Sequence, residues 1–238
     1  MWSVTLRLAG TPHLLLSEAE RRAAARFRVP ADAHRFGVAR TALRRVLSGY
    51  LGLSPLDLHF APGPFGKPAL RGEAGGPALH FNVSHSGERL LLAFARSREV
   101  GVDVEQVQPH LAREEDGEFL WSAPELGVLR QTTPARRAAT FFDLWTRKEA
   151  VLKASGRGLS VPPPEVCVAA PGEGFLGRVA LDPPAPGPRV WEVRALSVGP
   201  GYRAALAFEH RPSHPPRLRL WAVAEDDLGA LFPGGAPP

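Results

Sequence analysis

The sequence predicts an α+β protein made of two similar helix-plus-sheet halves, related by a pseudo-twofold duplication, with a functional cleft between them. Residues 46–55 and 151–162 share a pattern in which a helix end is followed by Gly-Leu-Ser, a proline and an apolar strand. Residues 87–94 and 201–208 are also alike, and the two offsets are 159 − 53 = 106 and 201 − 87 = 114 positions. Such offsets favour a duplication whose halves meet near residue 110, with chance similarity as the alternative. A cleft between two halves is a natural ligand site.

Helical and strand patterns alternate along the first half, residues 1–109. Apolar side chains recur at helical spacing in residues 32–50, with arginines on other faces. The first six residues alternate in the manner of a strand. Helices are therefore expected over 17–28 and 32–50, and strands over 1–6, 56–61, 79–84, 89–95 and 99–105.

The second half, residues 110–224, begins with helical patterns and continues as strands. A helical stretch is expected over 110–130, then a longer helix from about 135 to 154 that Gly156 closes. Cys167 lies between two valines and is expected on a strand. Strands are expected near 164–170, 175–181, 189–197, 201–209 and 217–223, joined by Pro/Gly turns. Residues 225–238 are expected to form a C-terminal tail.

The composition is that of a globular protein, with 44% hydrophobic and 22% charged residues. A single cysteine excludes an internal disulfide framework and a zinc cluster held by thiolates. No apolar run reaches the ~18 residues of a membrane span, and the N-terminus lacks the features of a signal peptide. We therefore expect a cytoplasmic protein without a membrane partner. The net charge of +5 suits nucleic acid, a phosphorylated ligand or an acidic protein.

Lysine is rare in this chain. Only Lys67, Lys148 and Lys153 occur, against 29 − 3 = 26 arginines. Lysine carries a compact ammonium group on a flexible stem, whereas the arginine guanidinium is a rigid fork. Retained lysines therefore indicate a geometric requirement, with compositional drift as the alternative.

Two carboxylates share one face of the strand expected at 99–105. Asp103 and Glu105 alternate with valines that point the other way into a core. Adjacent carboxylates repel each other unless a cation lies between them, and hard oxygen ligands of this kind suit Mg²⁺. A strand with a solvated polar face is the alternative.

Glu149 and Lys153 lie four residues apart, and hence side by side on the long helix. Flanking aromatic and aliphatic residues predict that this helix is largely buried. A carboxylate with two ammonium groups, Lys148 and Lys153, is costly there without partners. A metal site with lysines facing phosphate oxygens would supply those partners, and an ordinary surface pair is the alternative.

Residues 81–87 form a strand that runs into a turn, where Ser84, His85 and Ser86 can donate hydrogen bonds to an anion. Ser84 and His85 cannot form a nucleophile–base pair, because neighbours on a strand point to opposite faces. The chain also has no Gly-x-Ser-x-Gly elbow. The turn at 63–68 presents Lys67 but lacks the spacing of a Walker A loop.

Taken in order, these segments resemble the motifs of the 4′-phosphopantetheinyl transferase family, specifically its surfactin-synthetase-activating type. The resemblance runs from about residue 32 to residue 162. Its motifs are Asp32-Ala33-His34-Arg35, Gly66-Lys67-Pro68, Phe81-Asn82-Val83-Ser84-His85-Ser86, Gly101-Val102-Asp103-Val104-Glu105, Trp145-Thr146-Arg147-Lys148-Glu149 with Lys153, and Gly156-Arg157-Gly158-Leu159-Ser160.

The resemblance implies an enzyme that moves the phosphopantetheine arm of coenzyme A to a serine of an apo carrier protein, releasing adenosine 3′,5′-bisphosphate. It implies Mg²⁺ held by Asp103, Glu105 and Glu149. It also implies Glu149 as the base, directly or through water, with Lys153 and Lys148 at the phosphates. The expected contacts to coenzyme A are Arg35, Arg40, Gly66, Lys67, Pro68, Ser84, His85, Lys148 and Lys153. Residues 18–28 align loosely with the basic stretch of the family, which leaves the arginines at the adenosine end open.

The expected partners are coenzyme A and an apo acyl or peptidyl carrier protein, with the enzyme acting as a monomer. Carriers of this class are typically acidic, so a basic enzyme would attract them. A basic nucleic-acid-binding protein is an alternative, but the chain lacks the motifs for one. A catalytically silent paralogue is another, although every expected motif acid is present.

Overall fold

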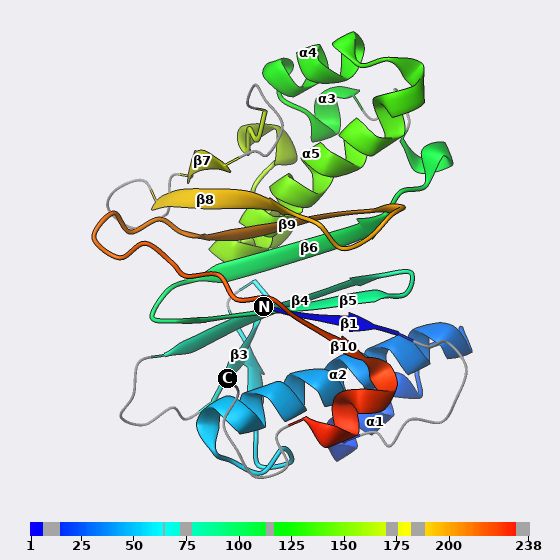
Figure 1. Cartoon of the computed structure of the whole chain (residues 1–238), viewed down its shortest axis with the longest axis vertical. Helices are drawn as coiled ribbons and strands as arrows, with labels where there is room; N and C mark the ends of the chain where they lie inside the picture. The colour runs from blue at the N-terminus through cyan, green and yellow to red at the C-terminus, as the bar shows by residue number, and fades with distance from the viewer. Residues whose placement is uncertain are drawn as a thin grey trace.

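The computed structural model describes residues 1–6, 15–63, 65–71, 78–112, 117–169, 176–181 and 189–231, and within 176–181 only the side chain of Val179. Two sheets lie at the centre, with helices on their outer sides (Figure 1). The prediction of an α+β class is confirmed. No helix in these ranges is long and apolar enough to cross a membrane.

The first sheet has the strand order β10-β1-β5-β4, and α2 packs against it through valines, leucines and alanines that form one hydrophobic core. A short hairpin of β2 and β3 forms a separate sheet. The N-terminal elements are β1 (Trp2–Thr5), α1 (Glu18–Ala24), α2 (Pro30–Leu51), β2 (Phe60–Pro62), β3 (Pro68–Leu70), β4 (Leu79–Ser86) and β5 (Arg89–Arg96).

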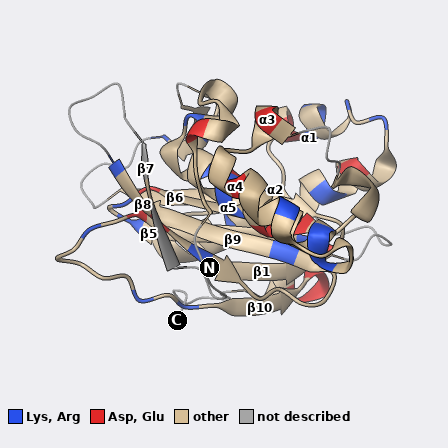
Figure 2. Ribbon diagram, turned by 90° about the horizontal axis from the view of Figure 1, so that it is seen from above, with Lys and Arg blue, Asp and Glu red and all other residues tan. Residues whose placement is uncertain are grey.

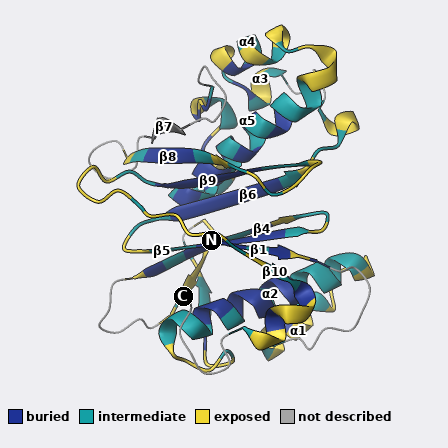
Figure 3. Cartoon of the chain, in the orientation of Figure 1, coloured by how far each residue is buried: buried dark blue, intermediate teal, exposed yellow. Residues whose placement is uncertain are grey.

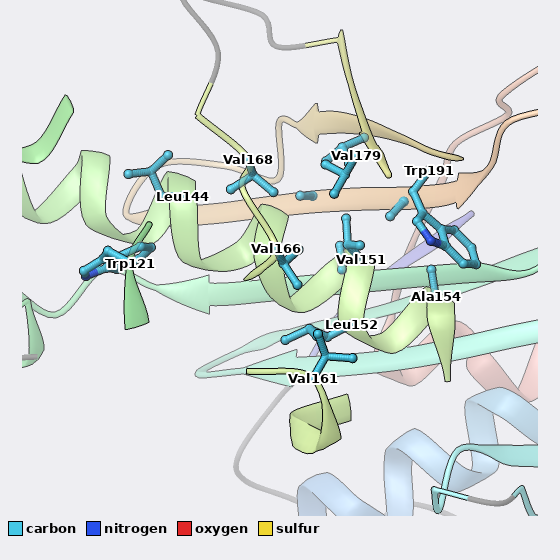
Figure 4. Packing of buried hydrophobic residues seen from close by; sticks show 14 of the residues in the cluster. Trp121, Leu144, Val151, Leu152, Ala154, Val161, Val166, Val168, Val179 and Trp191 are labelled. Atoms are coloured by element: carbon cyan, nitrogen blue, oxygen red, sulfur yellow. The ribbon is translucent and has the colours of Figure 1, made fainter. Parts of the chain in front are cut away.

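The second sheet has the order β6-β9-β8-β7 and is antiparallel throughout. Its outer face is covered by α5, whose apolar side packs into the core drawn in Figure 4. The elements are β6 (Val100–Gln106), α3 (Gly117–Leu120), α4 (Ala123–Gln131), α5 (Pro134–Ser155), β7 (Leu176–Leu181), β8 (Arg189–Leu196) and β9 (Tyr202–Glu209), with short 3-10 helices at Pro109–Leu111, Gly158–Ser160 and Pro163–Glu165.

A third core fills the space between the two sheets. It contains apolar side chains of β5, β6 and β9. The layers are therefore helix, sheet, sheet and helix, and the inner faces of both long helices are buried (Figure 3). Charged residues lie mostly on the helices and near strand ends, while the strand interiors are largely uncharged (Figure 2).

The last described strand returns to the first half. β10 (Trp221–Ala224) pairs in parallel with β1, and the Trp2 and Trp221 rings stack with centroids 5.0 Å apart. A 3-10 helix follows at Glu225–Ala230, and Leu228 is buried in the core of α2. The second half was expected to end at residue 224, with a tail after it. Instead, residues 221–230 belong to the first half, because β10 pairs with β1 and Leu228 packs in the core of α2. The rest of the expected tail, 232–238, lies outside the described residues.

The duplication itself stays a prediction. Each half has a 22-residue helix and a four-stranded sheet. The first sheet contains a parallel pair of strands, however, whereas the second is wholly antiparallel.

Three predicted elements differ from the structure. In 110–130 the helix is broken, because Ser122 caps a new helix that has Pro124 in its first turn. The strand expected at 56–61 begins only at Phe60, after a turn in which the Asp57 N–H bonds to the Ser54 carbonyl.

Of the strand expected at 164–170, residue 170 lies outside the described residues, and residues 165–169 show the buried–exposed alternation of a strand but do not pair with one. Val166 and Val168 are buried and Cys167 is exposed. Side chains occupy the backbone groups instead: the Val168 N–H donates to Glu125, and the Val166 carbonyl accepts from Lys148. A periodicity of two thus predicted burial correctly and strand pairing wrongly.

Candidate active site

The site begins at the line where the two sheets meet. β4 and β6 are each the edge of their own sheet, and side chains rather than a backbone ladder join them. Oxygens of Asn82, Ser84 and Ser86 accept hydrogen bonds from alternate backbone N–H groups of β6, at 2.9, 3.3 and 3.0 Å. Because strand side chains alternate, all three face β6 and fix its register against β4.

Gly101 sets the distance between β6 and α5. A Cβ atom at this position would lie 2.2 Å from the Ala150 carbonyl oxygen and 2.3 Å from the Ala154 nitrogen. Only glycine permits so close an approach of two backbones. This contact brings the part of α5 that carries Glu149 and Lys153 over the strand that carries Asp103 and Glu105.

A hollow of about 330 Å³ opens where these three elements meet. Its walls come from the first sheet, through β4, and from the second sheet and its covering helix, through β6 and α5. The lining residues are Val83, Ser84 and His85 of β4, Asp103 and Glu105 of β6, and Trp145, Glu149 and Lys153 of α5. Of the sequence-predicted site residues, this hollow therefore unites the three acids with Lys153, Ser84 and His85.

A short polar chain lies at its floor. The Lys153 ammonium donates to Asp103 Oδ1 at 2.5 Å and to Ser84 Oγ at 3.1 Å, and Ser84 Oγ donates to the same Asp103 oxygen at 2.8 Å. Ser84 is buried and its hydroxyl is engaged by protein groups. Its expected direct contact with a phosphate is therefore not seen in this arrangement.

The pKa of each of the three carboxyl groups is raised above its ordinary value. Burial raises the pKa of Asp103 despite the neighbouring Lys153. Burial also raises the pKa of Glu105 and of Glu149, and the negative charge of Asp103 raises both further. Three acids that repel one another in a desolvated hollow form a site that favours a cation.

The donor set fits a divalent metal, although its side chains are not arranged as a finished site. Within the described ranges, no three Asp, Glu, His or Cys side chains stand ready to hold one metal ion. Asp103 Oδ2 is nevertheless buried without a hydrogen-bond partner, and Glu105 is engaged through one oxygen by Ser86 at 2.7 Å. Free carboxylate oxygens of this kind are what Mg²⁺ prefers.

His85 and Arg35 form the rim nearest to α2. Arg35 donates to Asp32 at 2.8 Å and to the Gly87 carbonyl at 3.2 Å. Desolvation lowers the pKa of His85, and the charges of Lys153 and Arg35 lower it further. An anion bound at this rim would offset that positive charge.

Lys148 does not reach the hollow, and its expected place at the phosphates is wrong. Its side chain is 0% exposed. Its ammonium donates to Glu125 at 2.8 Å and to the carbonyls of Pro163 and Val166 at 2.6 Å each. Three acceptors complete the hydrogen bonding of an ammonium. Lys148 therefore connects α5 to α4 and to residues 163–166, which follow α5.

Lys67 is also engaged by protein groups rather than open to a phosphate. Its ammonium donates to Glu99 at 2.7 Å and to the carbonyls of Val100 and Ala154 at 3.0 and 3.2 Å. The turn at Gly66 thus ties the β2–β3 hairpin to the end of α5. Pro68 and Lys67 line a separate hollow of about 310 Å³ with Glu99 and residues 155–156.

Arg40 lies away from the lining residues, in a cluster on α1 and α2. It donates to Glu20 at 2.7 Å, and its guanidinium lies 4.5 Å from the Phe60 ring centroid. Arg44 binds the other oxygen of Glu20. Salt bridges inside the half account for Arg40, so its expected contact with coenzyme A has no support from this geometry.

The sequence reasoning missed the structural roles of several residues that build the site, including Ser86, which it expected to donate to an anion. Asn82 and Ser86 join the sheets, Gly101 permits the close approach of α5, and Trp145 lines the hollow. Glu125 could have been found, because Ser122-x-x-Glu125 is a capping box. The others give no signal until β4 and β6 are known to be neighbours.

Two family models match the chain. The model described as the 4′-phosphopantetheinyl transferase superfamily matches residues 99–207, which include the acids and Lys153. The model described as 4′-phosphopantetheinyl transferase, N-terminal, matches residues 2–97. The boundary between the two matches falls at the turn between β5 and β6.

Curated relatives agree with these matches. The chain is 30% identical to the 4′-phosphopantetheinyl transferase ffp of Bacillus subtilis over 86% of this chain and 87% of ffp. It is 29% identical to Sfp of Bacillus subtilis strain 168 over 88% of this chain and 89% of Sfp. The match to HetI of Nostoc sp. has 36% identity and spans 61% of each chain. With both halves matched by models of one family, the chain belongs to the 4′-phosphopantetheinyl transferase superfamily, and within it to the Sfp type.

Proposed function

We propose that this enzyme transfers the phosphopantetheine arm of coenzyme A to a serine of an apo carrier protein and releases adenosine 3′,5′-bisphosphate, with Mg²⁺ as cofactor. The observation that carries the proposal is the hollow between the sheets, where Asp103, Glu105 and Glu149 surround Lys153. The pyrophosphate and the three carboxylates are all negatively charged and would repel one another. A divalent metal bound between them would offset the charge of both.

Asp103, Glu105 and Glu149 would hold the metal, which when bound would neutralise charge on the pyrophosphate oxygens. The unpartnered Asp103 Oδ2 supports this assignment. The raised pKa of each acid supports it as well, since a nearby cation would remove the repulsion among them.

The protein side chains divide the chemistry. The serine hydroxyl of the carrier attacks the phosphorus that bears the pantetheine arm, and the bond from that phosphorus to the leaving adenosine bisphosphate breaks. Glu149 would take the hydroxyl proton, directly or through water, because burial raises its pKa toward that of an effective base. Lys153 would offset the charge that develops on the leaving phosphate.

The rim would bind the phosphates of coenzyme A. His85 and Arg35 carry or can gain positive charge there. Burial lowers the pKa of His85, and the charges of Lys153 and Arg35 lower it further, so a bound anion would offset that part of the shift. A further hollow, beside Lys67 and Pro68, lies along β4 and at the end of α5. We place the adenosine end of coenzyme A toward it.

The carrier would be drawn by the excess of positive charge, +5 over the whole chain. We propose that the enzyme acts as a monomer, because one chain supplies all walls of the hollow. Nucleic-acid binding remains the rival class. It predicts salt-dependent binding of DNA or RNA without binding of coenzyme A.

The test is a mass measurement on the carrier. Purified enzyme, coenzyme A and Mg²⁺ should add one phosphopantetheine group to members of a panel of apo acyl and peptidyl carriers. Chelation of the metal should stop the reaction, and fresh Mg²⁺ should restore it. No adduct on any carrier of the panel would refute the proposal, and activity that survives chelation would refute its metal.

A further inference from the structure

A third hollow, of about 260 Å³, lies at the edge between the two sheets and shares no lining residue with the active site. Its walls come from the end of β5, the start of β6, β9 and the connection that leads into β10. The lining side chains used below are Ala95, Arg96, Arg98, Phe208, Arg217 and Leu218.

The inner wall is apolar and continues the core between the sheets. Phe208 is buried and belongs to that core. Ala95 packs against the same core, and Leu218 is exposed at the mouth. A ligand group placed here would leave water for an apolar surface, which is favourable in proportion to the area covered.

The rim, in contrast, is basic. Arg96 and Arg217 are exposed, and the Arg98 guanidinium lies 6.0 Å from the centre of the Phe208 ring. Among the described residues, none of these three arginines forms a salt bridge. Three guanidinium groups without a counter-charge repel one another across a small opening.

Arg98 is incompletely satisfied. Its Nη2 donates to the His214 carbonyl at 2.6 Å, whereas its Nη1 is buried and has no hydrogen-bond partner. A buried donor without an acceptor is costly and rare in native proteins. The free Nη1 arm can donate a charge-assisted hydrogen bond to an oxygen of a carboxylate or phosphate.

We infer that this hollow binds an organic anion that carries a carboxylate or phosphate head on a short apolar group. The head would meet Arg98 with Arg96 and Arg217, and the apolar group would lie against Ala95 and Phe208. The inference is independent of the proposed transfer chemistry, because none of these residues contributes to the first hollow.

The test is calorimetric titration of the full chain saturated with coenzyme A, so that the active site is filled. Hexyl phosphate and hexanoate are the probes, and inorganic phosphate is the control without an apolar group. We expect at least one of these two six-carbon probes to bind about tenfold or more tighter than inorganic phosphate, since burial of its alkyl chain outweighs the cost of ordering that chain. Equal affinities for all three would mean an adventitious ion only and would overturn the inference.

Variants locate the binding. Arg98→Gln should weaken binding of the better six-carbon probe by about tenfold or more, since it removes a charge-assisted hydrogen bond. Because Arg217 is exposed, Arg217→Gln should weaken binding of that probe less and should not affect folding. Arg219→Gln is the matched control, because it removes an exposed arginine from the same connection but not from the hollow. If Arg219→Gln weakens binding as much as Arg217→Gln, the effect is bulk charge and the proposed site is wrong.

Discussion

Two lysines on the same helix, five residues apart, occupy opposite kinds of environment. Lys148 is fully enclosed, with one carboxylate and two carbonyls around its ammonium. Lys153 is 29% exposed and stands among three carboxylates whose pKa values are raised. The first site has every bond it can make, whereas the second has excess negative charge and an opening to solvent. The comparison teaches that incomplete satisfaction, rather than burial or residue type, distinguishes the chemical site from the structural one.

The largest expected effect is on the open site. Glu149→Gln keeps the shape of the side chain and removes its charge, so we expect kcat for carrier modification to fall about 10²–10⁴-fold. The mass-shift assay measures this fall, and circular dichroism should show an unchanged fold. Activity near that of the wild type would show that Glu149 is neither base nor ligand.

Lys148→Met breaks the enclosed site. It leaves the Glu125 carboxylate buried without its cation, and the free energy of unfolding should fall by about 3–5 kcal/mol. Urea denaturation measures this loss. At low temperature the folded variant should keep kcat within a few-fold of the wild type. A stable protein with lost transfer would mean that Lys148 belongs to the chemistry after all.

The matched control is the double variant Glu125→Leu/Lys148→Met. Replacing both charges by apolar groups removes the unpaired carboxylate, so part of the lost stability should return. The capping contact of Glu125 with Ser122 is lost in the double variant, so the recovery should be incomplete. No recovery at all would argue against a paired role for the two residues.

Lys153→Arg tests whether the open site needs a compact ammonium. The charge is kept, but a planar fork cannot occupy the position between Asp103 and Ser84 in the same way. We expect kcat to fall about 10–100-fold with little change in melting temperature. Full activity would reduce the role of Lys153 to its charge alone.

The smallest effect concerns pH. The folded pKa of Glu149 is raised above its unfolded value of 4.5, so the folded state holds its proton longer than the unfolded chain. Stability therefore falls as pH rises from about 4.5 through the folded pKa, and the loss persists at neutral pH. Glu149→Gln removes this loss and should be more stable than the wild type at pH 7 by about 1 kcal/mol or less.

Urea denaturation of both proteins between pH 4 and pH 8 measures the difference, in which the titrating groups that do not interact with Glu149 cancel. Glu99 is one such group: its pKa is lowered to about 2 by His80 and Lys67 against its burial, so its contribution to stability is lost as pH falls from about 4.5 toward 2, mostly below this window. An equal pH dependence in the two proteins would show that Glu149 is not destabilised by its surroundings.

The long helices and most strands were predictable because their periodicity matches their burial. α5 runs from Pro134 to Ser155, against a prediction of about 135 to 154, and Gly156 ends it in a left-handed conformation with φ of 71°. The acids and Lys153 of the hollow were likewise predicted, by spacing and by resemblance. The enclosed position of Lys148 was not predicted. Positions five apart lie about 140° from each other around a helix, so Lys148 and Lys153 face different sides of α5. Only tertiary packing shows which of the two faces the hollow.

The pairing of β10 with β1 has a consequence for how this protein is made. The second sheet and α5 come from one continuous stretch, residues 100–209, so all their strand partners are present once that stretch has left the ribosome. The first sheet cannot close until residues 221–224 have been synthesised, so β1 has one edge open while residues 6–220 are made. The sheet that contains β1 is therefore completed after the sheet that α5 covers.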